Sequence, residues 1–272
     1  MRDVHETVIF GENVSIECEK LKIGKYSKIG NNVKIKCKEL EIGDHFYMCD
    51  DVEIGRGGCT NPNSIVKIGN GVGIFENTII NPSDSIEIGD NCGIGAEVMI
   101  WTHGAWLDVT KGFPSDFGPV KIGKIVIIGK NVWMPARSIV LPNVTIGDNV
   151  VVGIDSIVNK SLPDGCLAAG SPCKIIKENM YPKKLSDEQI TEMTESIISD
   201  WLELIKAKGV TRAIEISYNN NEIVLNQGYE QTIYNIIDKT IDGDVNNVSE
   251  DLRDYLRRRG IKIYADRFFK SI

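Results

Sequence analysis

The sequence predicts an all-β solenoid over about its first two thirds and a small α/β domain after it. The main observation is a repeated pair, an aliphatic residue followed by glycine, as in Ile23-Gly24, Ile88-Gly89 and Ile146-Gly147. Neighbouring pairs are often six residues apart, and a small or aliphatic residue often lies four places after the first residue of a pair. This period indicates a three-sided coil, in which each six-residue edge points one aliphatic side chain inward and turns at the glycine.

Two other interpretations of the repeat fit the residues less well. A helix would lose about 1 kcal/mol for each interior glycine relative to alanine. A β-sandwich would need period-two alternation and hairpin turns, which the run 146–158 does not supply. In a coil, each Ile or Val packs on the same residue types one coil away, and burying its side chain stabilises the fold by about 1.5–3 kcal/mol. Asp44, Asp90 and Asp148 follow aliphatic-glycine pairs, so we expect them to bond their own backbone in turns.

Four longer motifs within the repeat resemble those of the hexapeptide-repeat acyltransferases. They are residues 128–134 (IGKNVWM), 141–147 (LPNVTIG), 158–164 (VNKSLPD) and 169–176 (AGSPCKII). The resemblance covers about residues 8–178 and implies a left-handed parallel β-helix, an exception to the usual right-handed crossover. It also implies a homotrimer that binds acetyl-CoA or another acyl-CoA between its subunits.

The repeat stops after Ile100, which predicts an external loop at residues 101–119. A long excursion from a solenoid usually has a function, and the family has its catalytic-base loop at this point. His103 lies at the edge of the loop and is the candidate base, because imidazole exchanges protons near neutral pH. Relatives often have a second histidine where this chain has Ala105. His103 is therefore either the base or a histidine with a structural hydrogen bond.

Four other side chains complete the predicted acceptor site. Trp106 and Asp108, from the same loop, are expected to contact the substrate. Glu97 and Asp84 lie on nearby coils and could orient an amine electrostatically. The alternative for these two carboxylates is an ordinary solvated position at a corner of the coil.

The resemblance also implies where the acyl-CoA binds. Backbone around Ala136 and Gly153 would meet the thioester and the pantetheine arm, since small side chains allow close approach. Lys160 and Lys174, the latter after Pro172, would lie near the nucleotide phosphates, where a charge on a flexible stem is useful. As surface lysines, both could equally be solvated.

Residues 1–178 are thus predicted to form the β-helix domain, and residues 179–272 a small α/β domain. Its first helix begins at Ser186, ends at Gly209 and has an apolar stripe that includes Met193. A second helix is expected at 249–259, with three arginines at its end that suit the helix dipole or a nucleotide phosphate. Strands are expected at residues 213–217, 222–225, 232–241 and 261–264.

Composition excludes several classes of protein. The formal net charge of -7 argues against a nucleic-acid partner, and no apolar run approaches the length of a membrane span. With no signal-peptide pattern in residues 1–6, we expect a cytoplasmic protein. The seven cysteines are scattered without a CxxC pair, so they are expected to be buried, reduced thiols. Three dispersed histidines do not form a metal site.

Two functions remain as hypotheses. The first is an N-acyltransferase that moves an acetyl or short acyl group, such as hydroxybutyryl, from CoA to the amino group of a nucleotide-linked sugar. The chain resembles that subgroup, including enzymes of the dTDP-anthrose pathway that act on dTDP-4-amino-4,6-dideoxyglucose. The alternative is an O-acetyltransferase for a sugar or polysaccharide hydroxyl, which needs a true base more urgently because a hydroxyl is a far weaker acid than an ammonium group.

Overall fold

The computed structural model describes residues 1–57, 59, 61–103, 108–111, 125–210 and 213–272. The chain divides into two compact units, Met1–Lys183 and Lys184–Ile272. The boundary lies a few residues beyond the one that the sequence predicts. Of the predicted loop at 101–119, the described part includes the short 3-10 helix η1 (Val109–Lys111). Trp106 lies outside the described residues.

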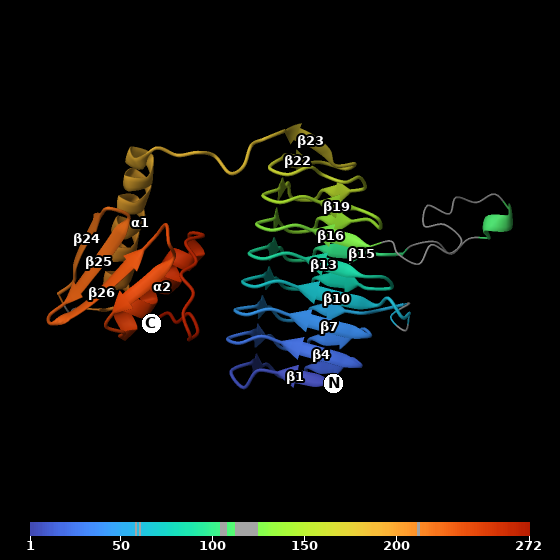
Figure 1. The fold of residues 1–272 in the computed structure, drawn as a ribbon, viewed down its shortest axis with the longest axis horizontal. Coiled ribbons are helices and arrows are strands. Elements are labelled where there is room, and N and C mark those ends of the chain that lie inside the picture. The colour runs from blue at the N-terminus through green and yellow to red at the C-terminus, as the bar shows by residue number, and fades with distance from the viewer. Residues whose placement is uncertain (58, 60, 104–107, 112–124, 211–212) are drawn as a thin grey trace. The chain divides into compact units, whose positions relative to one another are not determined.

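Unit 1 is a three-sided parallel β-helix, whose stacked coils are visible in Figure 1. Successive strands move from one sheet to the next, so that every third strand up to β21 belongs to the same sheet. All strand pairs are parallel except β22 with β23, where the chain turns back. The structure therefore confirms the parallel coil, while the left-handed winding stays a prediction.

The first sheet contains β1 (Arg2–Val4), β4 (Lys20–Ile23), β7 (Glu39–Ile42), β10 (Ile65–Ile68), β13 (Ile86–Ile88), β16 (Val126–Ile128) and β19 (Thr145–Ile146). The second contains β2 (Ile9–Phe10), β5 (Lys28–Ile29), β8 (Tyr47–Met48), β11 (Gly73–Ile74), β14 (Gly93–Ile94), β17 (Trp133–Met134), β20 (Val151–Val152), β22 (Leu167–Ala169) and β23 (Lys174–Lys177). The third contains β3 (Ser15–Glu17), β6 (Lys34–Lys36), β9 (Glu53–Ile54), β12 (Ile79–Asn81), β15 (Met99–Trp101), β18 (Ile139–Val140) and β21 (Ile157–Val158).

The core of unit 1 is built from columns of identical or similar side chains. One column on the first sheet is made entirely of isoleucines that pair strand by strand from β4 to β19 and are at most 3% exposed. The column comprises Ile23, Ile42, Ile68, Ile88, Ile128 and Ile146. These are the aliphatic members of the repeated pairs, so the sequence period and the stacking period coincide.

The glycines of the pairs are needed because the coils approach closely at the corners. A Cβ on Gly129 would lie 2.3 Å from Oδ1 of Asp148, which accepts a 2.7 Å hydrogen bond from the backbone N–H of Lys130. Asp44 and Asp90 accept the same kind of bond from the preceding coil. The expectation that these carboxylates bond their own turns was wrong, since they connect one coil to the next.

Unit 2 is an antiparallel sheet with two helices, rather than the α/β arrangement that the sequence predicts. The helix α1 (Asp187–Ala207) has a capping box at Ser186 and α2 (Asn247–Arg258) follows the sheet. Met193 was wrongly predicted in the apolar stripe of α1, because it is 53% exposed. The sheet order is β24 (Glu215–Asn219), β25 (Glu222–Gln227), β26 (Glu230–Asn235) and β27 (Thr240–Gly243).

Two strand predictions in unit 2 also need correction. The segment 232–241 is not one strand, because Oδ1 of Asn235 accepts hydrogen bonds from the N–H groups of Ile237 and Asp238 and turns the chain between β26 and β27. The segment 261–264 forms no strand, and only an isolated bridge joins Ala265 to Arg267. Neither helix in the described part of the chain is long and apolar enough to cross a membrane.

Candidate active site

His103 lies where the chain leaves the third sheet, on the edge of the coil between the third and first sheets. It follows β15, whose last residue Trp101 pairs with Asn81 at the end of β12. Gly57 follows β9 on the coil before that. Three successive coils therefore bring His103, Asn81 and Gly57 together, although 22 residues separate the first two in sequence.

A hydrogen-bond network fixes the orientation of the His103 ring. Nδ1 lies 2.7 Å from Oδ1 of Asn81 and 2.9 Å from Oγ of Ser83. Asn81 is fully buried, and its Nδ2 donates to the backbone carbonyls of Gly55, at 2.8 Å, and Gly57, at 3.1 Å. These two bonds use the amide nitrogen of Asn81 and therefore turn its oxygen toward the imidazole.

The network also sets the tautomer of His103. An amide oxygen only accepts hydrogen bonds, so Nδ1 of His103 carries the hydrogen that it donates to Asn81. In the neutral ring Nε2 then keeps its lone pair and can accept a proton. His103 and Gly57 are exposed, and Nε2 would lie 3.9 Å from a Cβ on Gly57. The basic nitrogen thus lies on an accessible side of the coil.

Asp84 belongs to the same edge but is buried. The N–H of Asp84 donates to Oγ1 of Thr102 at 2.9 Å, and Thr102 donates to the carbonyl of Asn81 at 2.8 Å. Oδ1 of Asp84 accepts a 2.7 Å bond from the N–H of Ser85. With 6% of its surface exposed, Asp84 helps to build the corner next to His103.

The residues predicted to bind acyl-CoA lie mostly on another edge of the coil. Ala136 follows β17 and Gly153 follows β20, so both lie between the second and third sheets, as does Glu97 before β15. A Cβ on Gly153 would come within 2.6 Å of Cβ of Ala169, so the backbone there has no room for a side chain. Lys160 is exposed at the edge where His103 lies, two coils further along.

In one copy of the chain the third sheet separates His103 from Ala136 and Gly153. The outward face of that sheet between the two edges is apolar over four consecutive coils. We call it the aliphatic strip; its half-buried members, paired strand by strand, are Ile79, Met99, Ile139 and Ile157. Pro172 and Lys174 are exposed beside the antiparallel turn between β22 and β23.

Asp108 is the other described member of the predicted acceptor site. Its Oδ1 accepts bonds from the hydroxyl of Thr110, at 2.7 Å, and from the N–H of Thr110, at 3.0 Å. These two donors lower the pKa of the exposed Asp108 carboxyl. Asp108 is thus ionised at the start of η1.

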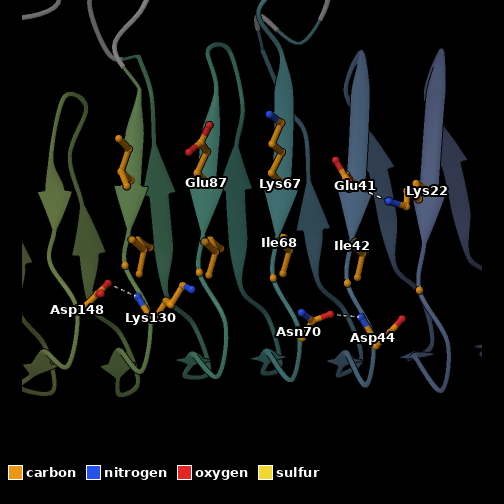
Figure 2. A pocket seen from close by; sticks show the side chains of 18 residues that line it. Lys22, Glu41, Ile42, Asp44, Lys67, Ile68, Asn70, Glu87, Lys130 and Asp148 are labelled. Atoms are coloured by element: carbon orange, nitrogen blue, oxygen red, sulfur yellow. Dashed lines mark hydrogen bonds and ion pairs between the residues drawn. The ribbon is translucent and has the colours of Figure 1, made fainter. Parts of the chain in front are cut away.

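A shallow pocket of about 690 Å³ lies on the first sheet and on its edge with the second sheet (Figure 2). Lysine and glutamate alternate across it, and Nζ of Lys22 lies 2.8 Å from Oε1 of Glu41. This bond raises the pKa of Lys22 and lowers that of Glu41. The pocket is lined by charges that compensate one another between coils and lies away from the His103 edge, so we do not take it as the active site.

Across the described residues, no three His, Cys, Asp or Glu side chains gather in a way that could hold a metal ion. Asn81 and Ser83 were not among the predicted site residues. The Asn81-Pro82-Ser83 sequence interrupts the repeat one coil before His103, which is the signal that could have indicated them.

Comparison with known proteins gives the family. No family model matches the chain. A putative acetyltransferase from Staphylococcus aureus strain Mu50 is 34% identical over 147 residues, which cover 43% of this chain and 73% of that protein. The chain belongs to the hexapeptide-repeat acetyltransferases. Galactoside O-acetyltransferase from Escherichia coli K12 is 39% identical over 108 residues, or 38% of this chain and 49% of that protein.

The other similarities are partial or concern the fold alone. The chain spans about half the length of the first curated relatives that it matches, from 49% to 57%. The crystal structure of a polysialic acid O-acetyltransferase covers 70% of this chain and 91% of its own, with a TM-score of 0.51 and 22% identity. This similarity supports the β-helix fold of unit 1.

Proposed function

We propose that the protein transfers an acetyl group from acetyl-CoA to a hydroxyl group of a sugar, with His103 as the general base. The observation that carries this proposal is the bond from Nδ1 of His103 to Asn81, which leaves Nε2 free to accept a proton. Membership of the acetyltransferase family supports acetyl-CoA as the donor. The names of two relatives, a galactoside and a putative lipopolysaccharide O-acetyltransferase, support a sugar hydroxyl as the acceptor.

The proposed reaction is a direct attack on the thioester. Nε2 of His103 takes the proton of the hydroxyl while its oxygen forms a bond to the acetyl carbonyl carbon. The carbon–sulfur bond then breaks, and the leaving CoA thiolate receives the proton from the imidazolium. A general base of this kind contributes about 10²- to 10⁴-fold to the rate. Trp106 and Asp108 remain the proposed contacts to the sugar.

The donor is proposed to lie along the edge that carries Ala136 and Gly153. Lys174 and Pro172, and Lys160 from the copy that supplies His103, are the proposed contacts to its nucleotide end, where lysines can neutralise phosphates. Because the third sheet separates this edge from His103 in one copy, a second copy has to bring the two edges together. We therefore propose a homotrimer of left-handed β-helices with its active sites between subunits. The aliphatic strip supports such packing, because a contiguous, partly exposed apolar surface favours association.

A second candidate is transfer of an acetyl or short acyl group to the amino group of a nucleotide-linked sugar. It is supported by the sequence resemblance to that subgroup and by Glu97, whose exposed carboxylate lies on the same edge as the proposed thioester site. Asp84 stays a candidate for orienting an amine only if the acceptor reaches the buried corner beside His103.

Matched acceptors distinguish the two candidates. Pairs of sugars that differ only in carrying a hydroxyl or an amino group at one carbon would be incubated with acetyl-CoA, free and as nucleotide conjugates. Thiol release gives the rate, and lability of the product in mild alkali separates an ester from an amide. We expect esters. Exclusive formation of alkali-stable amides would refute the hydroxyl proposal and support the second candidate.

A further inference from the structure

Two cysteines of unit 1 are in direct contact. Sγ of Cys18 lies 3.4 Å from Sγ of Cys37. Cys18 follows β3 and Cys37 follows β6, and the pairing of Glu17 with Lys36 stacks the two cysteines on adjacent coils. Neighbouring parallel strands are about 4.8 Å apart, which lies within the Cα separations that disulfides span. The backbone therefore already holds the two sulfurs at a spacing from which a bond can form.

The two thiols differ in their surroundings. Cys37 is 4% exposed, whereas Cys18 is only half-buried and can be reached by a small reagent. Their hydrogen bond lowers the pKa of Cys18 and, together with burial, raises the pKa of Cys37. The positive charge of Arg2 also favours the Cys18 thiolate, although burial and Glu17 oppose it. Cys18 is thus the thiol that ionises first, and the Cys37 thiol, which also lies 3.5 Å from the carbonyl oxygen of Glu39, is its hydrogen-bond partner.

We propose that Cys18 and Cys37 form a reactive thiol pair that low-molecular-weight disulfides, such as glutathione disulfide, oxidise to a disulfide bridge between the first two coils. The contact between the sulfurs, the accessibility of Cys18 and the burial of Cys37 beside it carry this inference. The reaction needs neither His103 nor an acyl-CoA.

Oxidation proceeds by two exchanges. The Cys18 thiolate attacks one sulfur of glutathione disulfide, forms a mixed disulfide and releases one glutathione thiolate. Cys37 then loses its proton, and its thiolate attacks Sγ of Cys18 and releases the second glutathione. The two protein sulfurs lose two electrons, which the reagent gains, and the two protons lost by the cysteines appear on the two glutathione thiols.

The bridge would stabilise a coil at one end of the stack. The strands β1, β2 and β3 are the terminal strands of their sheets and pair on one side only within the described structure. Val8, Val14 and Ile16 of this coil are only partly buried. A covalent bond between residues 19 positions apart would tie this coil to the next one and suppress its local opening.

Two other buried thiols bond backbone carbonyls, as Cys37 does, and serve as internal controls. Cys59 donates to the carbonyl of Arg56 at 2.9 Å, and Cys92 donates to that of Gly129 at 2.9 Å. Both are at most 5% exposed, so a disulfide reagent reaches them only when the coil opens. Burial also raises the pKa of Cys173, which lies before β23 at the opposite end of the stack of coils.

The test is a time course of the full, reduced chain with glutathione disulfide, followed by acid quench, alkylation of free thiols and peptide mapping. In the wild type we expect a cross-link between the peptides of Cys18 and Cys37, formed about tenfold or more faster than any change at Cys59, Cys92 or Cys173. Amide exchange of residues 1–17 should slow in the oxidised protein. The mapping needs no variant, so it does not depend on a mutant that folds.

Variants identify the order of attack. Cys37→Ser should accumulate one glutathione on Cys18 and show no cross-link, whereas Cys18→Ser should leave Cys37 unmodified over the same time. Cys173→Ser, which removes a buried thiol far along the coil, should behave as the wild type. Equal reactivity of all cysteines, or adducts on both Cys18 and Cys37 without a cross-link, would overturn the proposal.

Discussion

Oδ1 of Asn81 accepts a 2.7 Å hydrogen bond from Nδ1 of His103, across the boundary between two coils. The two residues meet because the parallel register places the ends of β12 and β15 side by side. Since Asn81 is itself held by the carbonyls of Gly55 and Gly57, three coils together determine which imidazole nitrogen is basic. The proposed chemistry thus depends on coil stacking and not on His103 alone.

Asn81→Ala should lower kcat by about ten- to a hundredfold, because His103 loses the acceptor that fixes its tautomer and orientation. The KM for acetyl-CoA should change little, since the proposed donor edge is elsewhere. Steady-state thiol release measures both constants. Asn149→Ala removes an amide that accepts a bond from Asn131 at a different edge and should retain kcat. Equal losses in the two variants would indicate a general structural effect instead.

Met99→Asp should dissociate the proposed trimer, because it places a charge in the middle of the aliphatic strip. Sedimentation velocity measures the change in assembly, and thiol release should fall with it if donor and base come from different copies. Lys34 lies on β6 of the same sheet, outside the aliphatic strip, where the exposed side chains are charged. Lys34→Asp should therefore leave the assembly intact. An active Met99→Asp monomer would contradict a site shared between subunits.

Gly129→Ala should destabilise unit 1 by about 1–3 kcal/mol, because the added Cβ would lie 2.3 Å from Oδ1 of Asp148 and 2.8 Å from backbone of the next coil. Gly73→Ala is the matched control, since its Cβ would meet only two atoms of the Phe75 ring, at 3.4 and 3.7 Å. Urea unfolding followed by circular dichroism compares the two. If both variants are equally stable, the corner glycines are not required by close approach.

The stability of unit 2 should fall in acid because of Asp251. Its carboxylate is fully buried and accepts bonds from Trp201 at 2.9 Å, from the N–H of Ile272 at 2.8 Å, and from Lys208. Burial raises the pKa of Asp251, but the hydrogen bonds outweigh burial and leave the pKa below its ordinary value. In the unfolded chain the pKa of an aspartate is about 3.9. Because the pKa of Asp251 is lower in the folded state, its ionised carboxylate stabilises unit 2 above about pH 3.9, and this stabilisation is lost as the pH falls through the folded-state pKa.

Pepsin cleavage within residues 184–272 reports the unfolding of unit 2. The urea concentration needed for this cleavage should therefore decrease steeply below about pH 4. Asp251→Asn should be less stable near that pH, by about 1–3 kcal/mol, and show a weaker dependence below it. Asp238→Asn changes an exposed carboxylate and should keep the wild-type slope. An unchanged slope in Asp251→Asn would show that other carboxylates dominate acid unfolding.

The sequence predicts the coil well because each repeated pair supplies both the aliphatic residue that points into the core and the glycine at the corner of the coil. Ile23, Ile42 and Ile68 are identical in kind and in register, so local pattern and tertiary stacking agree. Unit 2 has no such repeat. The division of 232–241 into two strands depends on the side chain of Asn235 capping two backbone N–H groups, a local bond that hydrophobic alternation does not indicate.

The candidate site was only partly predictable for a similar reason. His103 is indicated by the interruption of the repeat, but its partner Asn81 lies on another coil. The residue stacked on Asn81 is Trp101, and the spacing between stacked residues is 18 between Ile139 and Ile157 but 26 between Ile42 and Ile68. A fixed period therefore does not give the contact between Asn81 and His103. The contact between Cys18 and Cys37 was likewise hidden, because scattered cysteines give no spacing signal.

The most direct measurement is the kcat of acetyl transfer to a sugar hydroxyl by the wild type and by His103→Gln, whose side chain is polar and of similar size but cannot take the proton. Loss of about 10²- to 10⁴-fold in kcat, with ester as the product, is the predicted result. Wild-type rates of ester formation in His103→Gln would contradict the assignment of His103 as the base.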